Sequence, residues 1–91
     1  NKLKAVILYG SVARGTATEE SDIDIMVLVD GTAQELRTFE DQLSDVSTDI
    51  SIKYFKVFSI IDISYQEYMR WVNTSPFYRN VSKEGVILYA A

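Results

Sequence analysis

The sequence predicts an α+β fold in which helices pack on a small mixed β-sheet, an α/β two-layer arrangement. Two nearly all-apolar runs, residues 5–9 and 23–29, are typical of buried strands. Later segments place apolar residues three or four apart after capping signals, which is typical of helices. The 91 residues, 47% of them hydrophobic, suffice for one packed core. We therefore expect a single domain over residues 1–91, with an N-terminal element missing because the chain opens at Asn1 and enters a strand almost at once.

The first half of the chain predicts two strands and a helix. Gly10 ends the first apolar run, and the small polar residues 11–21 indicate a loop with one helical turn. The second strand, residues 23–29, stops at the turn pair Asp30-Gly31. Thr32 and Glu35 form a capping-box pattern, which predicts a helix over about residues 33–44.

The second half predicts a longer strand, two helices and an edge strand. Residues 47–61 are β-branched and aromatic and partly alternate in polarity, which predicts a third strand with one polar face. Ser64 with Glu67 forms another capping box, and Ser75-Pro76 is an N-cap followed by proline at the first helical position. Gly85 ends that helix, and residues 86–89 predict an edge strand.

Composition excludes several kinds of site. The chain has no cysteine and no histidine, so it holds no disulfide, no cysteine nucleophile, no Ser-His-Asp triad and no typical zinc site. Nine basic and thirteen acidic residues give a net charge of −4, which disfavours non-specific nucleic-acid binding. No apolar run approaches the roughly 20 residues of a membrane helix, and no signal peptide is visible. We expect a cytoplasmic domain with no membrane partner.

Two aspartates open the second strand. Asp22 and Asp24 are two residues apart, so their side chains lie on one face and repel each other unless a cation or a proton intervenes. Mg²⁺ suits such a pair, since it binds one or two carboxylates together with phosphate oxygens. If the strand containing Asp49 lies alongside, three carboxylates converge, as in a two-metal transfer site. The alternative is a solvated strand start, with Asp49 a turn residue.

The residues upstream of this pair suit a phosphate. Gly10 lacks a Cβ and lets an anion approach the backbone, and Ser11 adds a hydroxyl at the start of a helical turn. Arg14 lies one turn further on, within reach of a phosphate, although it could equally be a surface arginine. A P-loop explains Gly10 less well, because no lysine follows Gly15.

Joined at this spacing, the two halves resemble a known signature. Gly10-Ser11, ten residues and Asp22-x-Asp24, in the run GSVARGTATEESDID, resemble the DNA polymerase β-like nucleotidyltransferase superfamily, and most closely its minimal nucleotidyltransferases. The closing stretch SPFYRNVSKEGVILYA is similar too. The resemblance implies the nucleotidyltransferase fold, with Gly10, Ser11 and Arg14 at the triphosphate. It also implies that Asp22, Asp24 and Asp49 are catalytic and hold Mg²⁺, two ions in all.

The resemblance further implies an activity and a partner. It points to transfer of a nucleoside monophosphate, AMP from ATP, to a hydroxyl of a partner protein. Minimal nucleotidyltransferases often pair with a small helical HEPN protein in toxin–antitoxin systems, where they modify a tyrosine of that partner. The alternative is a binding module, or an antitoxin that acts by holding its partner with little turnover. A stand-alone antibiotic-modifying enzyme fits less well, since the similar proteins carry an extra domain.

Overall fold

A four-stranded mixed sheet forms the centre of the molecule, in the order β3-β2-β1-β4. The computed structural model describes residues 3–31 and 33–91. Strand β1 pairs antiparallel with β2 and with β4, whereas β2 and β3 run parallel. The predicted mixed sheet and the predicted order of elements are confirmed. The strands and helices, in chain order, are β1 Leu3–Tyr9, α1 Gly10–Arg14, β2 Ile23–Val29, α2 Ala33–Tyr54, β3 Phe58–Ser64, α3 Tyr65–Trp71, α4 Pro76–Glu84 and β4 Val86–Ala90.

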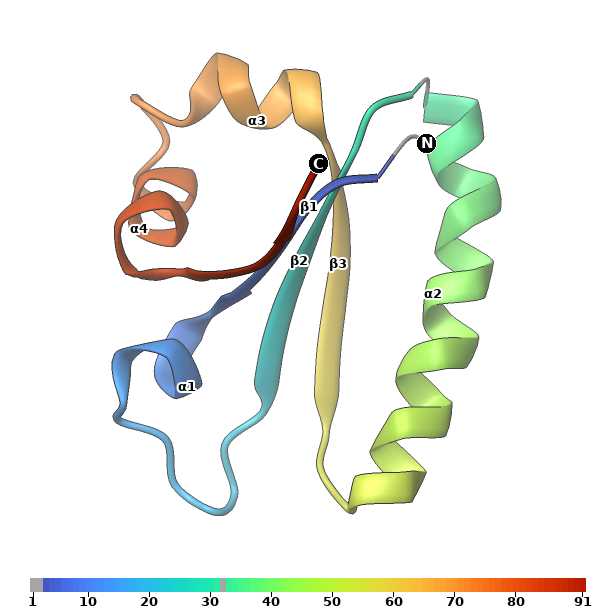
Figure 1. The fold of residues 1–91 in the computed structure, drawn as a ribbon, viewed down its shortest axis with the longest axis vertical. Helices are drawn as coiled ribbons and strands as arrows, with labels where there is room; N and C mark the ends of the chain where they lie inside the picture. The colour runs from blue at the N-terminus through green and yellow to red at the C-terminus, as the bar shows by residue number, and fades with distance from the viewer. Residues whose placement is uncertain (1–2, 32) are drawn as a thin grey trace.

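Helices cover both faces of the sheet. Helix α2 lies on one side, and α1, α3 and α4 lie on the other (Figure 1). A buried cluster joins the sheet to α3 and α4, and Met26 is its fully buried member. Because side chains alternate along β2, Met26 and Leu28 enter this cluster, while Val27 and Val29 are buried on the α2 side. The second strand is apolar over its last five residues because both of its faces are covered.

Helix α2 is ten residues longer than the sequence predicts. The predicted helix ended near residue 44, whereas α2 continues to Tyr54. The helical spacing continues through Leu43, Ser47 and Ile50, which are all partly buried. Two hydrogen bonds fasten this part of α2 to β3. The Ser47 hydroxyl donates to the Phe58 carbonyl at 2.8 Å, and the Phe58 N–H donates to the Ser51 hydroxyl at 3.2 Å.

The predicted third strand over residues 47–61 is therefore wrong in its first half. Strand β3 begins at Phe58 and ends at Ser64. The alternation of Ile50, Ile52 and Tyr54 suggested a strand, but Ile52 and Tyr54 are exposed on the helix. β-branched residues favour strands only weakly, and packing against a sheet outweighs that preference.

The capping predictions for the last two helices are confirmed. The Glu67 N–H donates to the Ser64 hydroxyl, and the Tyr78 N–H donates to the Ser75 hydroxyl. Gly85 follows α4, and its N–H donates to the Val81 carbonyl at 2.9 Å. The Thr32 cap of the first capping box lies outside the described residues.

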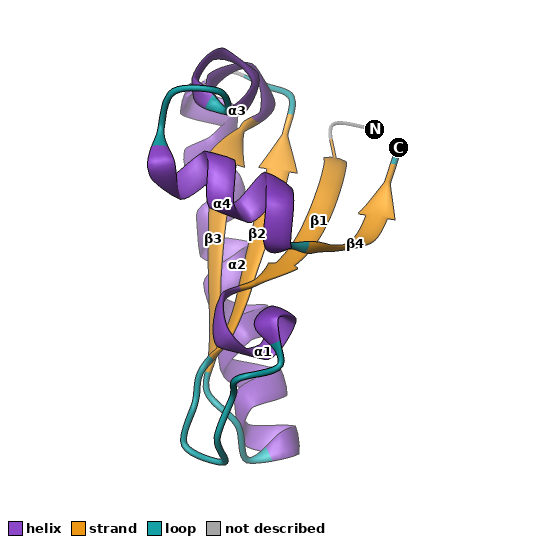
Figure 2. Cartoon of the chain, turned by 90° about the vertical axis from the view of Figure 1, so that its left-hand side faces the viewer, coloured by secondary structure: helices purple, strands orange, loops and turns teal. Residues whose placement is uncertain are grey.

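Strand β4 forms one edge of the sheet, as predicted, and lies beside β1 (Figure 2). Helix α4, which directly precedes β4 in the sequence, packs against the sheet. No helix among residues 3–31 and 33–91 is long and apolar enough to cross a membrane.

Candidate active site

Gly10 marks the junction between β1 and α1, where the chain turns out of the sheet. Its φ of +77° lies in the left-handed region, which glycine tolerates better than any other residue. A β-carbon built on Gly10 would collide with the Asp24 carboxylate, 3.2 Å from its Cγ. The backbone of Gly10 therefore lies directly against the Asp24 side chain. The two predicted arms of the site, the Gly-Ser pair and the aspartate pair, are in contact.

Helix α1 is one short turn closed by a second left-handed glycine. Gly15 has a φ of +75°, and its N–H donates to the Val12 carbonyl at 3.2 Å. Thr16 then donates from its N–H to the Ser11 carbonyl at 3.0 Å. These bonds return the chain toward β2 through the loop 16–22, which runs beside the turn between α2 and β3 at one end of the molecule (Figure 1). Ser11 is thereby held next to Gly10 at the start of α1.

Asp24 lies in the sheet and Asp22 lies just before it. Asp24 is partly buried, with Tyr9 of β1 opposite it on one side and Ser59 of β3 on the other. Burial and the nearby Asp22 carboxylate raise the pKa of Asp24, and the Arg14 guanidinium acts in the opposite direction. Asp22 is exposed. The Asp22 charge thus disfavours the ionised form of Asp24 in the fold.

Arg14 projects from the end of α1 toward α4. Its Nη1 lies 3.4 Å from Glu84 Oε2, and both side chains are about half exposed, 48% and 44%. The same guanidinium is close enough to Asp24 to lower the pKa of that carboxyl. Arg14 therefore lies near both Glu84 and Asp24, and it lines the same hollow as Gly10. A phosphate bound at Gly10 would lie close to the positive charge of Arg14.

The structure separates Asp49 from the aspartate pair. Asp49 was expected at the start of a strand beside Asp22, but it lies on α2, on the opposite side of the sheet, and is exposed. Among the described residues, no three acidic side chains gather closely enough to hold a metal ion. The geometric reason for assigning Asp49 as the third carboxylate is therefore wrong. That reason assumed that Asp49 begins a strand, whereas residues 33–54 form helix α2.

Sequence reasoning missed Tyr9 as a residue of this site. Tyr9 pairs with Asp24 across the sheet, and burial together with the Asp24 charge raises the pKa of its hydroxyl. Its ring meets Phe77 of α4 edge to face, with the centroids 5.7 Å apart. A hollow of about 220 Å³ lies here, bounded by Tyr9, Gly10, Arg14, Phe77, Asn80, Val81 and Glu84. The signal in the sequence is the position of Tyr9 directly before Gly10-Ser11.

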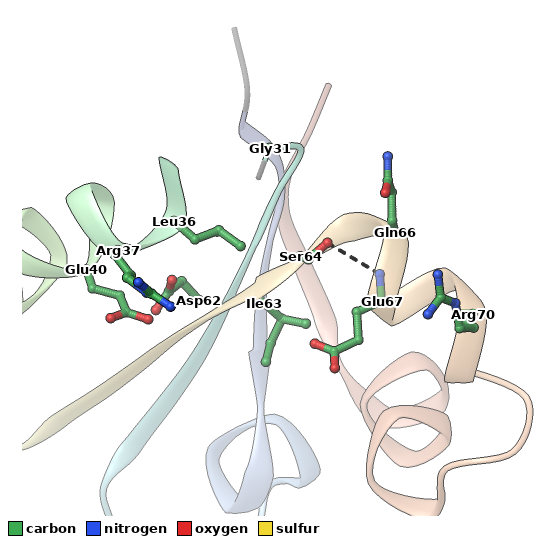
Figure 3. Close-up of a pocket in the computed structure, with 10 residues that line it drawn as sticks. All are labelled: Gly31, Leu36, Arg37, Glu40, Asp62, Ile63, Ser64, Gln66, Glu67 and Arg70. Atoms are coloured by element: carbon green, nitrogen blue, oxygen red, sulfur yellow. Dashed lines mark hydrogen bonds between the residues drawn. The ribbon is translucent and has the colours of Figure 1, made fainter. Parts of the chain in front are cut away.

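A larger hollow, about 540 Å³, lies at the other end of the sheet. It is formed where β2 and β3 end, between α2 and α3 (Figure 3). Its charged lining is mixed, with Arg37, Glu40 and Asp62 on one side and Glu67 and Arg70 on the other (Figure 3). This mixture of charges favours neither an anionic nor a cationic ligand, and neither Gly10 nor Asp24 lines this hollow. The candidate site is the contact between Gly10 and Asp24, and the smaller hollow adjoins it through Gly10 and Arg14.

The residues present fit one divalent cation held together with phosphate. Asp22 and Asp24 are close enough for one charge to shift the pKa of the other, and a cation between them would relieve that repulsion. Mg²⁺ needs only one or two protein carboxylates when phosphate oxygens and water complete its octahedral shell. The contact between the Gly10 backbone and Asp24 leaves the phosphate arm and the carboxylates side by side.

Similar proteins have a consistent description. A 40% identical protein from Methanocaldococcus jannaschii, matched over 97% of this chain and 80% of its own length, is named "Putative protein adenylyltransferase". A second protein of that organism with the same name is 66% identical over 29 residues, 32% of this chain and 29% of its own. The fold also matches a solved structure described as a toxin-antitoxin with AMP-PNP, at a TM-score of 0.62 and 22% identity. That match covers all of this chain, which spans 64% of the chain it matches.

A family model covers the whole chain, including both motifs of the candidate site. The model for the polymerase beta nucleotidyltransferase domain matches residues 1–91, which include Gly10-Ser11 and Asp22-x-Asp24. In the structure these two motifs contact each other through Gly10 and Asp24. The chain belongs to the polymerase beta nucleotidyltransferase family.

Proposed function

We propose that this chain is a Mg²⁺-dependent transferase that moves AMP from ATP to a hydroxyl group of a partner protein. The observation that carries the proposal is the contact between Gly10 and Asp24, with Asp22 and Arg14 beside it. This contact brings a backbone suited to phosphate next to carboxylates suited to Mg²⁺. The names of the relatives support an adenylyl group and a protein acceptor.

Each residue has a proposed task in this transfer. The backbone of Gly10 and the hydroxyl of Ser11 bind the triphosphate, and Arg14 contributes positive charge to it. Asp22 and Asp24 hold Mg²⁺, which when bound neutralises phosphate charge and orients the α-phosphate. The acceptor oxygen then forms a bond to the α-phosphorus, the bond to the bridging oxygen of the β-phosphate breaks, and pyrophosphate leaves. The hydroxyl proton is released to solvent.

The partner is proposed to be a small helical protein of the HEPN type. The structural match to a toxin-antitoxin shows only that the folds are alike, at 22% identity. It nevertheless supports a search for a partner protein, because the matched structure is described as a toxin-antitoxin. The proposal places the reaction in the cytoplasm, where ATP and Mg²⁺ occur together.

A second candidate function is an antitoxin or binding module with little turnover. The observation that favours it is the absence of a third carboxylate near Asp24 in the described part of the chain. Such a module would still bind nucleotide through Gly10 and the aspartate pair. It would act by holding its partner instead of modifying it.

The deciding experiment uses ATP labelled at the α-phosphate. The full chain is incubated with this ATP, Mg²⁺ and the protein encoded by the adjacent gene, and the label on that protein is counted. Transfer is expected with the unchanged chain and is expected to be lost in Asp22→Asn and Asp24→Asn. Nucleotide binding without any transfer would instead support the binding module.

A further inference from the structure

Ser59 occupies the position on β3 that faces Asp24. The two strands run parallel, and their register pairs Asp24 with Ser59 and Met26 with Ile61. Paired residues on neighbouring strands present their side chains to the same face, and the strands lie about 4.8 Å apart. Ile61 packs with Met26 in the cluster beneath α3 and α4, which confirms the face for this part of β3. Ser59 is therefore the β3 side chain nearest to the Asp24 carboxylate in the register.

A carboxylate at this position would complete a cluster of three. Asp24 lies in β2 and Asp22 directly precedes that strand, and a third acid at position 59 of the adjacent strand would lie beside Asp24. Three carboxylates allow two divalent cations to be held a few ångströms apart, whereas two carboxylates with phosphate suffice for one. The hydroxyl of Ser59 carries no charge and is a much weaker ligand.

No other acid on β3 or α2 can take this place. Asp62 is the acidic residue of β3, but it pairs with Val27 and lies on the opposite face, toward α2. Asp49 is exposed on α2, on that same opposite side. Consistently, the described residues hold no group of three acids around Asp24.

We propose that Ser59 stands at the third ligand position of the metal site, so that this chain binds one divalent cation with its nucleotide instead of two. The proposal rests on the proposed function, because it concerns the same nucleotide site. It differs from the two ions expected from the sequence. It also means that β3 supplies no third carboxylate beside the aspartate pair to accept the proton of the acceptor hydroxyl.

The test counts cations directly and does not depend on transfer. Mn²⁺ is titrated into the full chain saturated with α,β-methylene-ATP, which cannot donate AMP, and free Mn²⁺ is measured by electron paramagnetic resonance. The unchanged chain is expected to bind one Mn²⁺ per bound nucleotide. Ser59→Asp is expected to bind two, or to bind the second at least about tenfold more tightly than the unchanged chain, since affinity follows the number of charged ligands.

Ser64→Asp is the matched control. It adds the same charge to the same strand, roughly 16 Å away by strand rise, at an N-cap where aspartate is as suitable as serine. It is expected to leave the count at one. A thermal melt of each variant without cation checks that it folds, and Mn²⁺ is expected to raise the melting temperature of Ser59→Asp more than that of Ser64→Asp.

The outcomes separate this inference from the proposed function. Two tightly bound cations in the unchanged chain, or a Ser59→Asp variant that behaves like Ser64→Asp, would overturn the inference and leave the proposed function in place. A chain that binds no nucleotide would overturn both. One cation in the unchanged chain and two in Ser59→Asp would support the inference whether or not the transfer assay succeeds.

Discussion

The backbone of Gly10 and the carboxylate of Asp24 are in contact, and no β-carbon fits between them. Gly10 therefore meets two separate requirements, a left-handed φ of +77° and room for the aspartate. Gly15, five residues on, has nearly the same φ of +75° but no atom within 4 Å of its missing β-carbon. The two glycines can be compared directly. A side chain at either position would have to adopt a left-handed φ, but only at Gly10 would its β-carbon collide with Asp24.

Gly10→Ala is expected to destabilise the fold more than Gly15→Ala does. An alanine in the left-handed region costs about 1 kcal/mol, which is the whole effect expected at Gly15. At Gly10 the displaced carboxylate adds to this, and we expect roughly 2–4 kcal/mol in total. Urea unfolding measures both. Gly10→Ala is also expected to abolish nucleotide binding, and equal losses of stability with binding retained would contradict the contact described here.

Asp24→Asn is expected to raise the melting temperature at pH 7 in the absence of cations. Burial raises the pKa of Asp24, and Asp22 raises it further, so the folded state disfavours the ionised form. A group with a raised folded pKa stabilises the fold at low pH and loses that contribution as the pH rises through the folded value. The advantage of asparagine should therefore vanish below the ordinary aspartate pKa of about 4.

The measurement is a series of thermal melts from pH 3 to pH 8. Asp49→Asn, at an exposed position on α2, serves as the control and is expected to change the melting temperature little. An Asp24→Asn variant that loses stability at pH 7, or gains equally at every pH, would show that the carboxylate is not strained by its surroundings.

We expect Asp22 and Asp24 to be needed for adenylyl transfer and Asp49 not to be needed. Asp22→Asn and Asp24→Asn should each reduce adenylyl transfer roughly 100-fold or more, because each removes a carboxylate that would hold the Mg²⁺ ion, and that ion would neutralise phosphate charge. Asp49→Asn should transfer at close to the unchanged rate, since Asp49 lies on α2 across the sheet from the pair. Initial rates with α-labelled ATP measure this, and a large loss in Asp49→Asn would restore the original assignment.

Arg14→Ala is expected to weaken ATP binding about tenfold while changing stability by less than about 1 kcal/mol. The small effect on stability is expected because its ion pair with Glu84 is half exposed, and exposed pairs contribute little. The effect on binding follows from the loss of a charge-assisted contact to phosphate. Calorimetric titration with ATP measures the affinity. Arg79→Ala, an exposed arginine of α4, is the control, and an equal loss there would show a general charge effect.

Phe55→Gly is expected to stabilise the fold, although it removes a large apolar side chain. Phe55 has a φ of +54° and is 92% exposed, so its ring gains little from burial while its backbone occupies the left-handed region. Relief of that strain, about 1–2 kcal/mol, exceeds the entropic cost of glycine in the unfolded chain. We expect a net gain of about 0.5–1 kcal/mol in urea unfolding. Phe55→Ala keeps the strain and should show no such gain.

Local patterns in the sequence predicted most of the elements that carry the site. Short apolar runs predicted the buried strands. Ser64 and Ser75 cap helices by accepting hydrogen bonds from the N–H groups three residues later. The spacing of ten residues between Gly10-Ser11 and Asp22-x-Asp24 is also a property of the sequence itself. These features depend on neighbours in the chain.

The tertiary structure alone decided which side chains surround Asp24 in the proposed metal site. Residues 47–54 have both the composition of a strand and the spacing of a helix, and contacts of Ser47 and Ser51 with β3 select the helix. That choice moved Asp49 across the sheet. The neighbour of Asp24 then became Ser59, through a register between strands joined by a 22-residue helix. Sequence determined which residues could bind phosphate and cation, whereas the pairing of distant strands decided how many carboxylates meet there.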